Sequence, residues 1–151
     1  MKERSVTHAT FVIERSYPAK PERVFAAFSD PAKKRRWFTS DKEFQPEPFA
    51  MDFRVGGRER SSFQTQGATC TNDTVYLDIV PNVRIVMAYT MTLGDHCISS
   101  SHATTELLPS PKGTDLIFTE QAAFFEGADG PQIREEGWRR LLDNLEKTFA
   151  H

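Results

Sequence analysis

The strongest constraint on the fold is an amphipathic helix near the C-terminal end of the sequence. Residues 130–149 read GPQIREEGWRRLLDNLEKTF, in which Trp138, Leu141, Leu142, Leu145 and Phe149 recur at helical spacing. At about 100° per residue, these side chains form one broad apolar stripe. No second helix of comparable length is predicted elsewhere in the sequence. We therefore expect the stripe to lie against a β-sheet.

Seven segments alternate apolar and polar residues in the manner of half-buried strands. They are residues 8–17, 49–55, 58–64, 74–80, 84–93, 98–107 and 114–124. Two short helices are predicted after the first strand, over residues 21–28 and 32–38, each with a proline at its start. Residues 64–73 are predicted to form a longer polar loop, and the other turns are short. Short turns between consecutive strands indicate an antiparallel sheet.

The dimensions of these elements predict a space between helix and sheet. Seven strands make a sheet roughly 30 Å across, whereas a helix is only about 10–12 Å wide. The sheet must therefore curl around the helix, with the short helices closing one end. The strand 98–107 supports a space, because only small or polar residues lie between its apolar ends. Either Ser99, Ser101, Ala103 and Thr105 face inward or Ser100, His102 and Thr104 do, and at a sheet edge this polarity would only reflect solvation.

Composition and charge argue for one domain over residues 1–151 and exclude several classes of function. A net charge of −2 gives no field that attracts nucleic acid. No apolar run is long enough for membrane insertion, and the N-terminus lacks the apolar core of a secretory signal, so we expect a cytoplasmic protein. Cys70 and Cys97 are expected to be reduced, although a disulfide stays open. The four histidines lack metal-ligand spacing, so neither a metal nor a cofactor is predicted.

Loose motifs recur along nearly the whole sequence in a fixed order. They are R-x-Y-x-A-x-P-x-x-V-F at 15–25, D-P and a later tryptophan at 30–37, D-x-R-V-G-G at 52–57, P-x-x-R-I at 81–85, G-T at 113–114, T-E-Q at 119–121 and G-W-x-x-L-L-D-x-L at 137–145. In order and spacing the chain resembles the START-like (SRPBCC) superfamily. The similarity is greatest to the branch of the activator of the heat-shock-protein ATPase and the calicheamicin self-sacrifice resistance protein.

The resemblance implies an α+β helix-grip fold of the order β-α-α-β6-α. In this fold a curved antiparallel sheet wraps around a long C-terminal helix and often encloses an apolar cavity. Members bind lipids, polyketides and other apolar molecules; some are cyclases and some are cochaperones. We therefore expect a protein that binds a small apolar or amphipathic ligand between sheet and helix, as a monomer or homodimer.

Two alternatives to a binding protein stay open. One is an enzyme of the polyketide cyclase or hydrolase type that uses Glu120, Arg134 or His102. The other is a protein that acts on a chaperone; the eukaryotic cochaperones carry a further N-terminal domain that this sequence lacks, which weighs against that expectation. Known hydrolase, metalloprotease and nucleotide-binding motifs are absent from the sequence, so no catalytic residue is assigned.

Twelve side chains are predicted to line the ligand site. They are Trp37, Phe53, Phe63, Met87, Tyr89, His102, Phe118, Glu120, Arg134, Trp138, Leu141 and Leu142. For the aromatic, leucine and methionine side chains, the alternative is ordinary core packing. His102 is a candidate general base only if it faces inward.

Arg134 is the most informative polar residue because it lies on the apolar stripe, one turn before Trp138. We expect a cation at the mouth of the pocket, paired with Glu120 or with an anionic ligand group. The alternative is an aliphatic stem whose charged end reaches solvent. The basic run 33–36 is predicted to be a solvated helix surface. Gly137, inside the helix, is predicted to mark a close approach by a neighbouring element.

Overall fold

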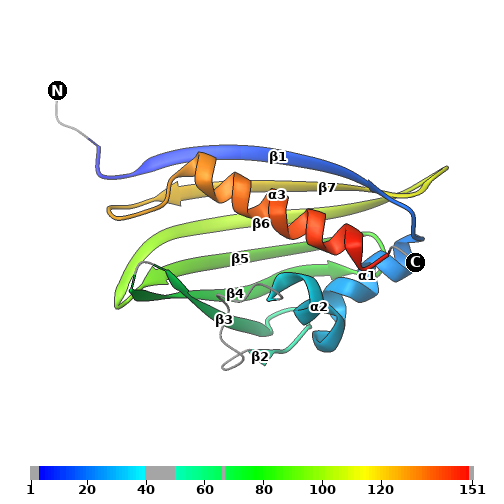
Figure 1. Cartoon of the computed structure of the whole chain (residues 1–151), viewed down its shortest axis with the longest axis horizontal. Coiled ribbons are helices and arrows are strands. Elements are labelled where there is room, and N and C mark those ends of the chain that lie inside the picture. Colours follow the sequence, from blue (N-terminus) through cyan, green and yellow to red (C-terminus); the bar gives the residue numbers. More distant parts are fainter. Residues whose placement is uncertain (1–3, 40–49, 66, 150–151) are drawn as a thin grey trace.

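The fold is a curved seven-stranded antiparallel sheet with helices on one face. The computed structural model describes residues 4–39, 50–65 and 67–149. Helix α3 (Pro131–Lys147) lies across the sheet, with α1 (Pro21–Ser29) and α2 (Pro31–Phe38) near its C-terminal end (Figure 1). The strands are β1 (Thr7–Tyr17), β2 (Ala50–Met51), β3 (Arg58–Thr65), β4 (Ala68–Val80), β5 (Arg84–Leu93), β6 (His96–Ser110) and β7 (Gly113–Phe124). The predicted helix-grip fold is confirmed.

The strand order places β6 in the interior of the sheet. The order is β1-β7-β6-β5-β4-β3-β2, and every pairing is antiparallel. The strand with small side chains is therefore not an edge strand. Its inner face carries Ser99, Ser101, Ala103 and Thr105, all buried. Of the two faces left open by the sequence, the structure selects this one.

The two short helices follow the prolines that predicted them. Pro21 is the first residue of α1, and Pro31 is the first residue of α2. The Asp30 carboxylate caps α2 by accepting hydrogen bonds from the backbone amides of Ala32 at 2.9 Å and Lys33 at 3.4 Å. Trp37 joins the two helices, because its indole Nε1 donates to the Ala27 carbonyl at 2.9 Å.

The predicted loop over residues 64–73 is wrong, because most of it belongs to the β3–β4 hairpin. Residues 58–65 pair with residues 68–75 in register. The prediction failed because Asn72, which shares the inner face of β4 with Tyr76, is polar and breaks the apolar alternation. Apolar alternation therefore begins only after the strand has already run for several residues.

The predicted strand over residues 49–55 is shorter than expected. Phe49 lies outside the described residues, and β2 covers only Ala50–Met51. After β2 the chain turns, with the Arg54 amide donating to the Asp52 carbonyl at 3.0 Å and the Gly57 amide donating to the Arg54 carbonyl at 2.7 Å. A Cβ on Gly57 would lie 2.0 Å from the Asp52 carbonyl oxygen, so this tight turn requires glycine.

Helix α3 buries the predicted stripe against the sheet. Trp138, Leu142 and Leu145 are buried, and Leu141 is partly buried against the same core. The expectation for Gly137 is wrong: a Cβ there would meet nothing within 4 Å. Gly137 therefore weakens the helix without serving a close contact. None of the described helices is long and apolar enough to cross a bilayer.

Candidate functional site

A small space lies between the helices and the sheet, much smaller than the cavity expected from the sequence. Its volume is about 10 Å³, roughly the room that one water molecule needs. It is lined by Phe28, Lys34, Trp37, Phe53, Tyr76, Ile85, Met87, Thr105 and Trp138. Four of the predicted ligand residues, Trp37, Phe53, Met87 and Trp138, are among them. We call this the internal space.

Aromatic rings fill most of the room around the internal space. The ring centroids of Phe53 and Tyr76 lie 4.8 Å apart, and those of Phe28 and Trp37 lie 4.9 Å apart. These distances are typical of packed aromatic pairs. At the small residues of β6, the Ser101 hydroxyl donates to the Glu120 carboxylate and the Arg134 guanidinium donates to the Ser99 hydroxyl. The volume that the sequence predicted is therefore largely occupied by the protein itself.

A buried ion pair adjoins the internal space through Lys34, which lines it. The Lys34 ammonium lies 2.7 Å from Glu59 Oε1, and the Tyr76 hydroxyl donates a hydrogen bond to the same oxygen. Lys34 is 4% exposed and Glu59 is 3% exposed. Burial raises the pKa of Tyr76 most, and the negative charge of Glu59 raises it further. The Tyr76 hydroxyl therefore keeps its proton. We call these three residues the Lys34 cluster.

The prediction of a solvated basic surface over residues 33–36 is wrong for Lys34. Helix α2 turns Lys34, Trp37 and Phe38 onto one buried face, since they stand at i, i+3 and i+4. The Lys34 ammonium lies 4.7 Å from the centroid of the Phe38 ring. The helical spacing relative to Trp37 was the signal in the sequence. The prediction gave more weight to the four consecutive basic residues, 33–36, than to this spacing.

A second buried cluster lies beneath the N-terminal half of α3, and we call it the Arg134 cluster. Glu120 is fully buried, and the Tyr89 hydroxyl lies 2.8 Å from both of its carboxylate oxygens. The Ser101 hydroxyl donates to Glu120 Oε2 at 2.9 Å. The Trp138 indole donates to the Tyr89 oxygen at 3.1 Å. Strands β5, β6 and β7 and helix α3 are thus joined through one carboxylate and one phenol.

Arg134 completes this cluster from α3. One of its terminal nitrogens lies 3.8 Å from Glu120 Oε2. Its Nε and a terminal nitrogen donate to the two carboxylate oxygens of Asp129 at 2.9 and 2.8 Å. Further hydrogen bonds run to the Ser99 hydroxyl at 2.9 Å and to the Tyr89 hydroxyl at 3.3 Å. The predicted pair of Arg134 and Glu120 is therefore present.

The position of Arg134 differs from the predicted pocket mouth. Its side chain is 5% exposed, and its hydrogen bonds are made to protein groups. Burial raises the pKa of Glu120, although the hydrogen bond from Tyr89 and the charge of Arg134 act against this. Burial alone would lower the pKa of Arg134, but Tyr89 and Asp129 outweigh it and the pKa is raised. The cluster joins α3 to the sheet and presents no open cation.

His102 lies apart from both clusters. It is exposed on the outer face of the sheet, between Ala88 on β5 and Gln121 on β7. Side chains of a strand alternate between faces, so the burial of Ser101 and Ala103 directs His102 outward. The condition for its predicted role as a general base is therefore not met.

The remaining predicted ligand residues belong to the core around the internal space. Phe118 and Leu142 are buried, and the Phe118 ring centroid lies 4.3 Å from that of Trp138. Phe63 and Leu141 are partly buried and pack against the core. None of these four lines the internal space. Their placement fits the alternative of ordinary core packing.

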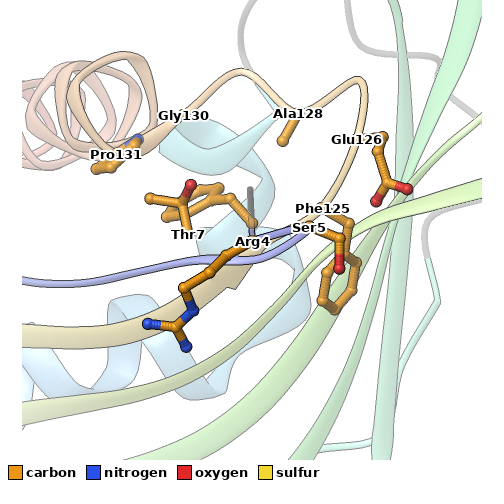
Figure 2. Close-up of a pocket in the computed structure, with 9 residues that line it drawn as sticks. Arg4, Ser5, Thr7, Phe125, Glu126, Ala128, Gly130 and Pro131 are labelled. Atoms are coloured by element: carbon orange, nitrogen blue, oxygen red, sulfur yellow. The ribbon is translucent and has the colours of Figure 1, made fainter. Parts of the chain in front are cut away.

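A larger, open groove lies at the other end of α3, and Figure 2 shows it between the start of the chain and the β7–α3 loop. Its volume is about 440 Å³, and its lining residues are Arg4, Ser5, Thr7, Phe124, Phe125, Glu126, Ala128, Gly130 and Pro131. The polar side chains of Arg4, Ser5, Thr7 and Glu126 are all exposed. Solvent screens such groups, so their contribution to recognition is weak. We call this the outer groove.

The described residues provide neither a disulfide nor a metal cluster. Cys70 and Cys97 are both free thiols, the first buried and the second exposed. Burial raises the pKa of Cys70 to about 11, so its thiol is not activated as a nucleophile. Within residues 4–39, 50–65 and 67–149, no group of three or more His, Cys, Asp or Glu side chains is placed to hold a metal ion.

Comparison with known proteins adds a family to this geometry. Residues 18–150 match the model of the family described as activator of Hsp90 ATPase homolog 1-like protein. The chain matches none of the curated proteins with which it was compared.

Solved structures share both fold and sequence with the chain. A protein from Rhizobium leguminosarum is 44% identical, with 98% of both chains covered and a TM-score of 0.91. A protein from Rhizobium loti is 48% identical, with coverage of 95% and 99% and a TM-score of 0.87. An AHSA1-like protein from Aeromonas hydrophila has a TM-score of 0.68 at 20% identity over 92% of this chain and 90% of its own, which shows a shared fold.

Proposed function

Because this chain belongs to the family of activator of Hsp90 ATPase homolog 1-like proteins, whose fold is consistent with ligand binding, we propose that it binds a small apolar or amphipathic molecule. The proposed site is the internal space between the sheet and helices α2 and α3. The observation that carries the proposal is the wall of this space, where aromatic side chains and Met87 lie around Lys34, a buried cation that is paired with Glu59. Ligand sites combine apolar walls with a few placed polar groups in the same way.

The size of the internal space implies that ligand and side chains exchange places. Sites for small molecules usually have volumes of about 300–1,000 Å³, whereas the internal space has about 10 Å³. Phe53 is only partly buried, so its ring can leave the wall without crossing the core. Met87 is unbranched and adapts to irregular shapes. We propose that these two side chains move when the ligand enters.

The enzyme alternative has less support from the same geometry. A cyclase or hydrolase needs a titrating group that can reach the substrate. His102 is exposed on the opposite face of the sheet, and Glu120 and Arg134 are occupied by hydrogen bonds within the protein. A binding protein requires none of these residues to be free.

Intrinsic fluorescence tests the proposal directly, because the chain has two tryptophans and both line the internal space. We expect saturable quenching of Trp37 and Trp138 when the neutral apolar probe N-phenyl-1-naphthylamine is titrated into the purified protein. Native mass spectrometry of the same sample should show one bound probe per chain. If binding is absent in both measurements, the proposal is wrong.

Three variants locate the bound probe. Thr105→Ile adds bulk to the wall of the internal space and should weaken binding at least tenfold. Thr104→Ile is its matched control, since Thr104 is the next residue of β6 and faces the opposite side of the sheet. Thr7→Phe narrows the outer groove and should leave binding unchanged. Loss of binding in Thr7→Phe but not in Thr105→Ile would assign the ligand to the outer groove instead.

A further inference from the structure

We propose that Lys34 selects the ligand by donating a hydrogen bond to a neutral acceptor oxygen, a carbonyl or a hydroxyl, on an otherwise apolar molecule. This inference rests on the proposed function, because it assigns the polar end of the same site. It predicts a preference for ketones, aldehydes, esters or alcohols over carboxylates and amines of equal size.

The first argument is the donor capacity of Lys34. A lysine ammonium carries three N–H donors and no acceptor. Among the described residues, Glu59 Oε1 is the one hydrogen-bond acceptor on Lys34 Nζ, at 2.7 Å. The Phe38 ring takes up a second direction, with its centroid 4.7 Å away. Because Lys34 also lines the internal space, its remaining donor capacity adjoins the position of the ligand.

The second argument is the charge balance of the wall. Lys34 and Glu59 form a neutral buried pair, and Tyr76 adds a hydroxyl that stays protonated. A carboxylate ligand would bring a second anion close to Glu59, and an ammonium would bring a second cation close to Lys34. An uncompensated buried charge is strongly unfavourable. A neutral oxygen accepts from Lys34 and leaves the balance intact.

The third argument is the contrast with Arg134. Its guanidinium already donates to Asp129, Ser99 and Tyr89 and lies beside Glu120. It also lies outside the wall of the internal space. Among the described residues Lys34 and Arg134 are the two buried cations, and of these Lys34 combines spare donor capacity with contact to the space.

Three matched ligands test this preference by displacing N-phenyl-1-naphthylamine. They are 2-acetylnaphthalene with a neutral carbonyl, 2-isopropenylnaphthalene with the same shape and no acceptor oxygen, and 2-naphthoate with an anionic group. In the native protein the ketone should bind about tenfold more tightly than the hydrocarbon, because a hydrogen bond to a charged group contributes at least that much. The ketone should also bind more tightly than the naphthoate.

Charge variants test whether the ketone preference depends on Lys34 and not on the other residues that line the internal space. The double variant Lys34→Met with Glu59→Gln removes both charges and should lower the preference for the ketone over the hydrocarbon to about onefold. The single variant Glu59→Gln leaves Lys34 without its counter-ion and should shift the preference at least tenfold toward the naphthoate. Lys33→Met is the matched control, because Lys33 is the exposed neighbour on the same helix. Circular dichroism confirms that each variant is folded.

The outcomes are distinguishable from failure of the proposed function. If the hydrocarbon binds but the native protein shows no ketone preference, the proposed function stands and the role of Lys34 is wrong. The role is also wrong if the preference survives in the double variant, or if Glu59→Gln does not favour the anion. If none of the three ligands and no probe binds, the proposed function itself fails.

Discussion

Two buried clusters connect helices to the sheet, and each consists of one basic side chain, one glutamate and one tyrosine. The two clusters differ in what surrounds them. They are Arg134, Glu120 and Tyr89 beneath α3, and Lys34, Glu59 and Tyr76 beneath α2. In each, a carboxylate accepts from a tyrosine hydroxyl and lies beside a cation. The Arg134 cluster is enclosed by further hydrogen bonds, whereas the Lys34 cluster borders the internal space.

The two clusters differ in how many hydrogen bonds the cation makes within the protein and in whether the cation adjoins a space. The planar guanidinium of Arg134 matches Asp129 with two parallel hydrogen bonds and reaches Ser99 as well. The point charge of Lys34 uses one carboxylate oxygen. The first cluster therefore joins α3 to the sheet, and the second is the one to which we assign ligand recognition in our proposal.

The largest expected effect is on the Arg134 cluster. Arg134→Met removes the donors to Asp129, Ser99 and Tyr89 and leaves Glu120 buried without its cation. Breaking a buried pair in this way costs about 3–5 kcal/mol in the free energy of unfolding, which urea denaturation measures. The control is Arg139→Met on the same helix, whose ion pair with Glu135 is partly exposed, and it should change stability by no more than about 0.5 kcal/mol. Equal losses of unfolding free energy in both variants would contradict the role of the Arg134 cluster in holding α3 on the sheet.

A smaller loss is expected in the Lys34 cluster. Lys34→Met leaves the Glu59 carboxylate buried, but the Tyr76 hydroxyl still donates to it. The loss should be about 2–3 kcal/mol. Adding Glu59→Gln should recover part of it, because the remaining buried charge is removed. A double variant that is less stable than Lys34→Met alone would show that the pair is not coupled as described.

The pH dependence of stability sharpens the comparison further. Burial raises the pKa of Glu120 in the folded protein. A carboxyl group that holds its proton more tightly in the folded state contributes stability below its unfolded pKa, about 4.3, and loses that contribution as pH rises through the folded pKa. Glu120→Gln has no charge to titrate. The stability of the native protein relative to this variant should therefore fall as pH rises above the unfolded pKa of about 4.3.

This prediction is measured as the difference in unfolding free energy between the two proteins at each pH. The constant cost of the substitution cancels when two pH values are compared. A difference that stays the same, or that changes in favour of the native protein as pH rises, would mean that burial does not dominate the ionisation of Glu120.

The smallest effect concerns the helix that joins the Arg134 cluster to the internal space. Gly137→Ala should stabilise the protein by about 0.5–1 kcal/mol, since alanine is the better helix former and its Cβ meets nothing within 4 Å. Ligand preference should not change. Gly57→Ala is the opposite case, because its Cβ would lie 2.0 Å from the Asp52 carbonyl oxygen, and it should destabilise. Thermal melts of the two variants should move in opposite directions.

Much of the fold could be predicted from sequence because local signals specify it. Pro21, Asp30 and Pro31 place the starts of α1 and α2, and the spacing around Trp138 places α3. Where the local signal was weak, the prediction failed. The first half of β4 carries polar residues such as Asn72 on its inner face and was interpreted as a loop.

Parts of the candidate site were also within reach of the sequence. Trp37, Phe53, Met87 and Trp138 were predicted and line the internal space, because each follows an apolar periodicity. Lys34 was missed, although its spacing from Trp37 placed it on the buried face of α2. Nothing in the sequence indicated Glu59 as the partner of Lys34. The two residues are 25 positions apart and come into contact only when α2 packs over β3.

By itself, then, the sequence determined the order of most elements and which residues share a face, because these depend on spacing along one segment. The helix-grip fold was an expectation that came from the resemblance to a known family. Only the tertiary structure decided how the space between those faces is filled. That outcome depends on side chains distant in sequence, such as Tyr89 and Arg134, which are 45 residues apart and joined by a hydrogen bond. Periodicity predicts which way a side chain points, but whether room is left beside it depends on every side chain that arrives from the opposite layer.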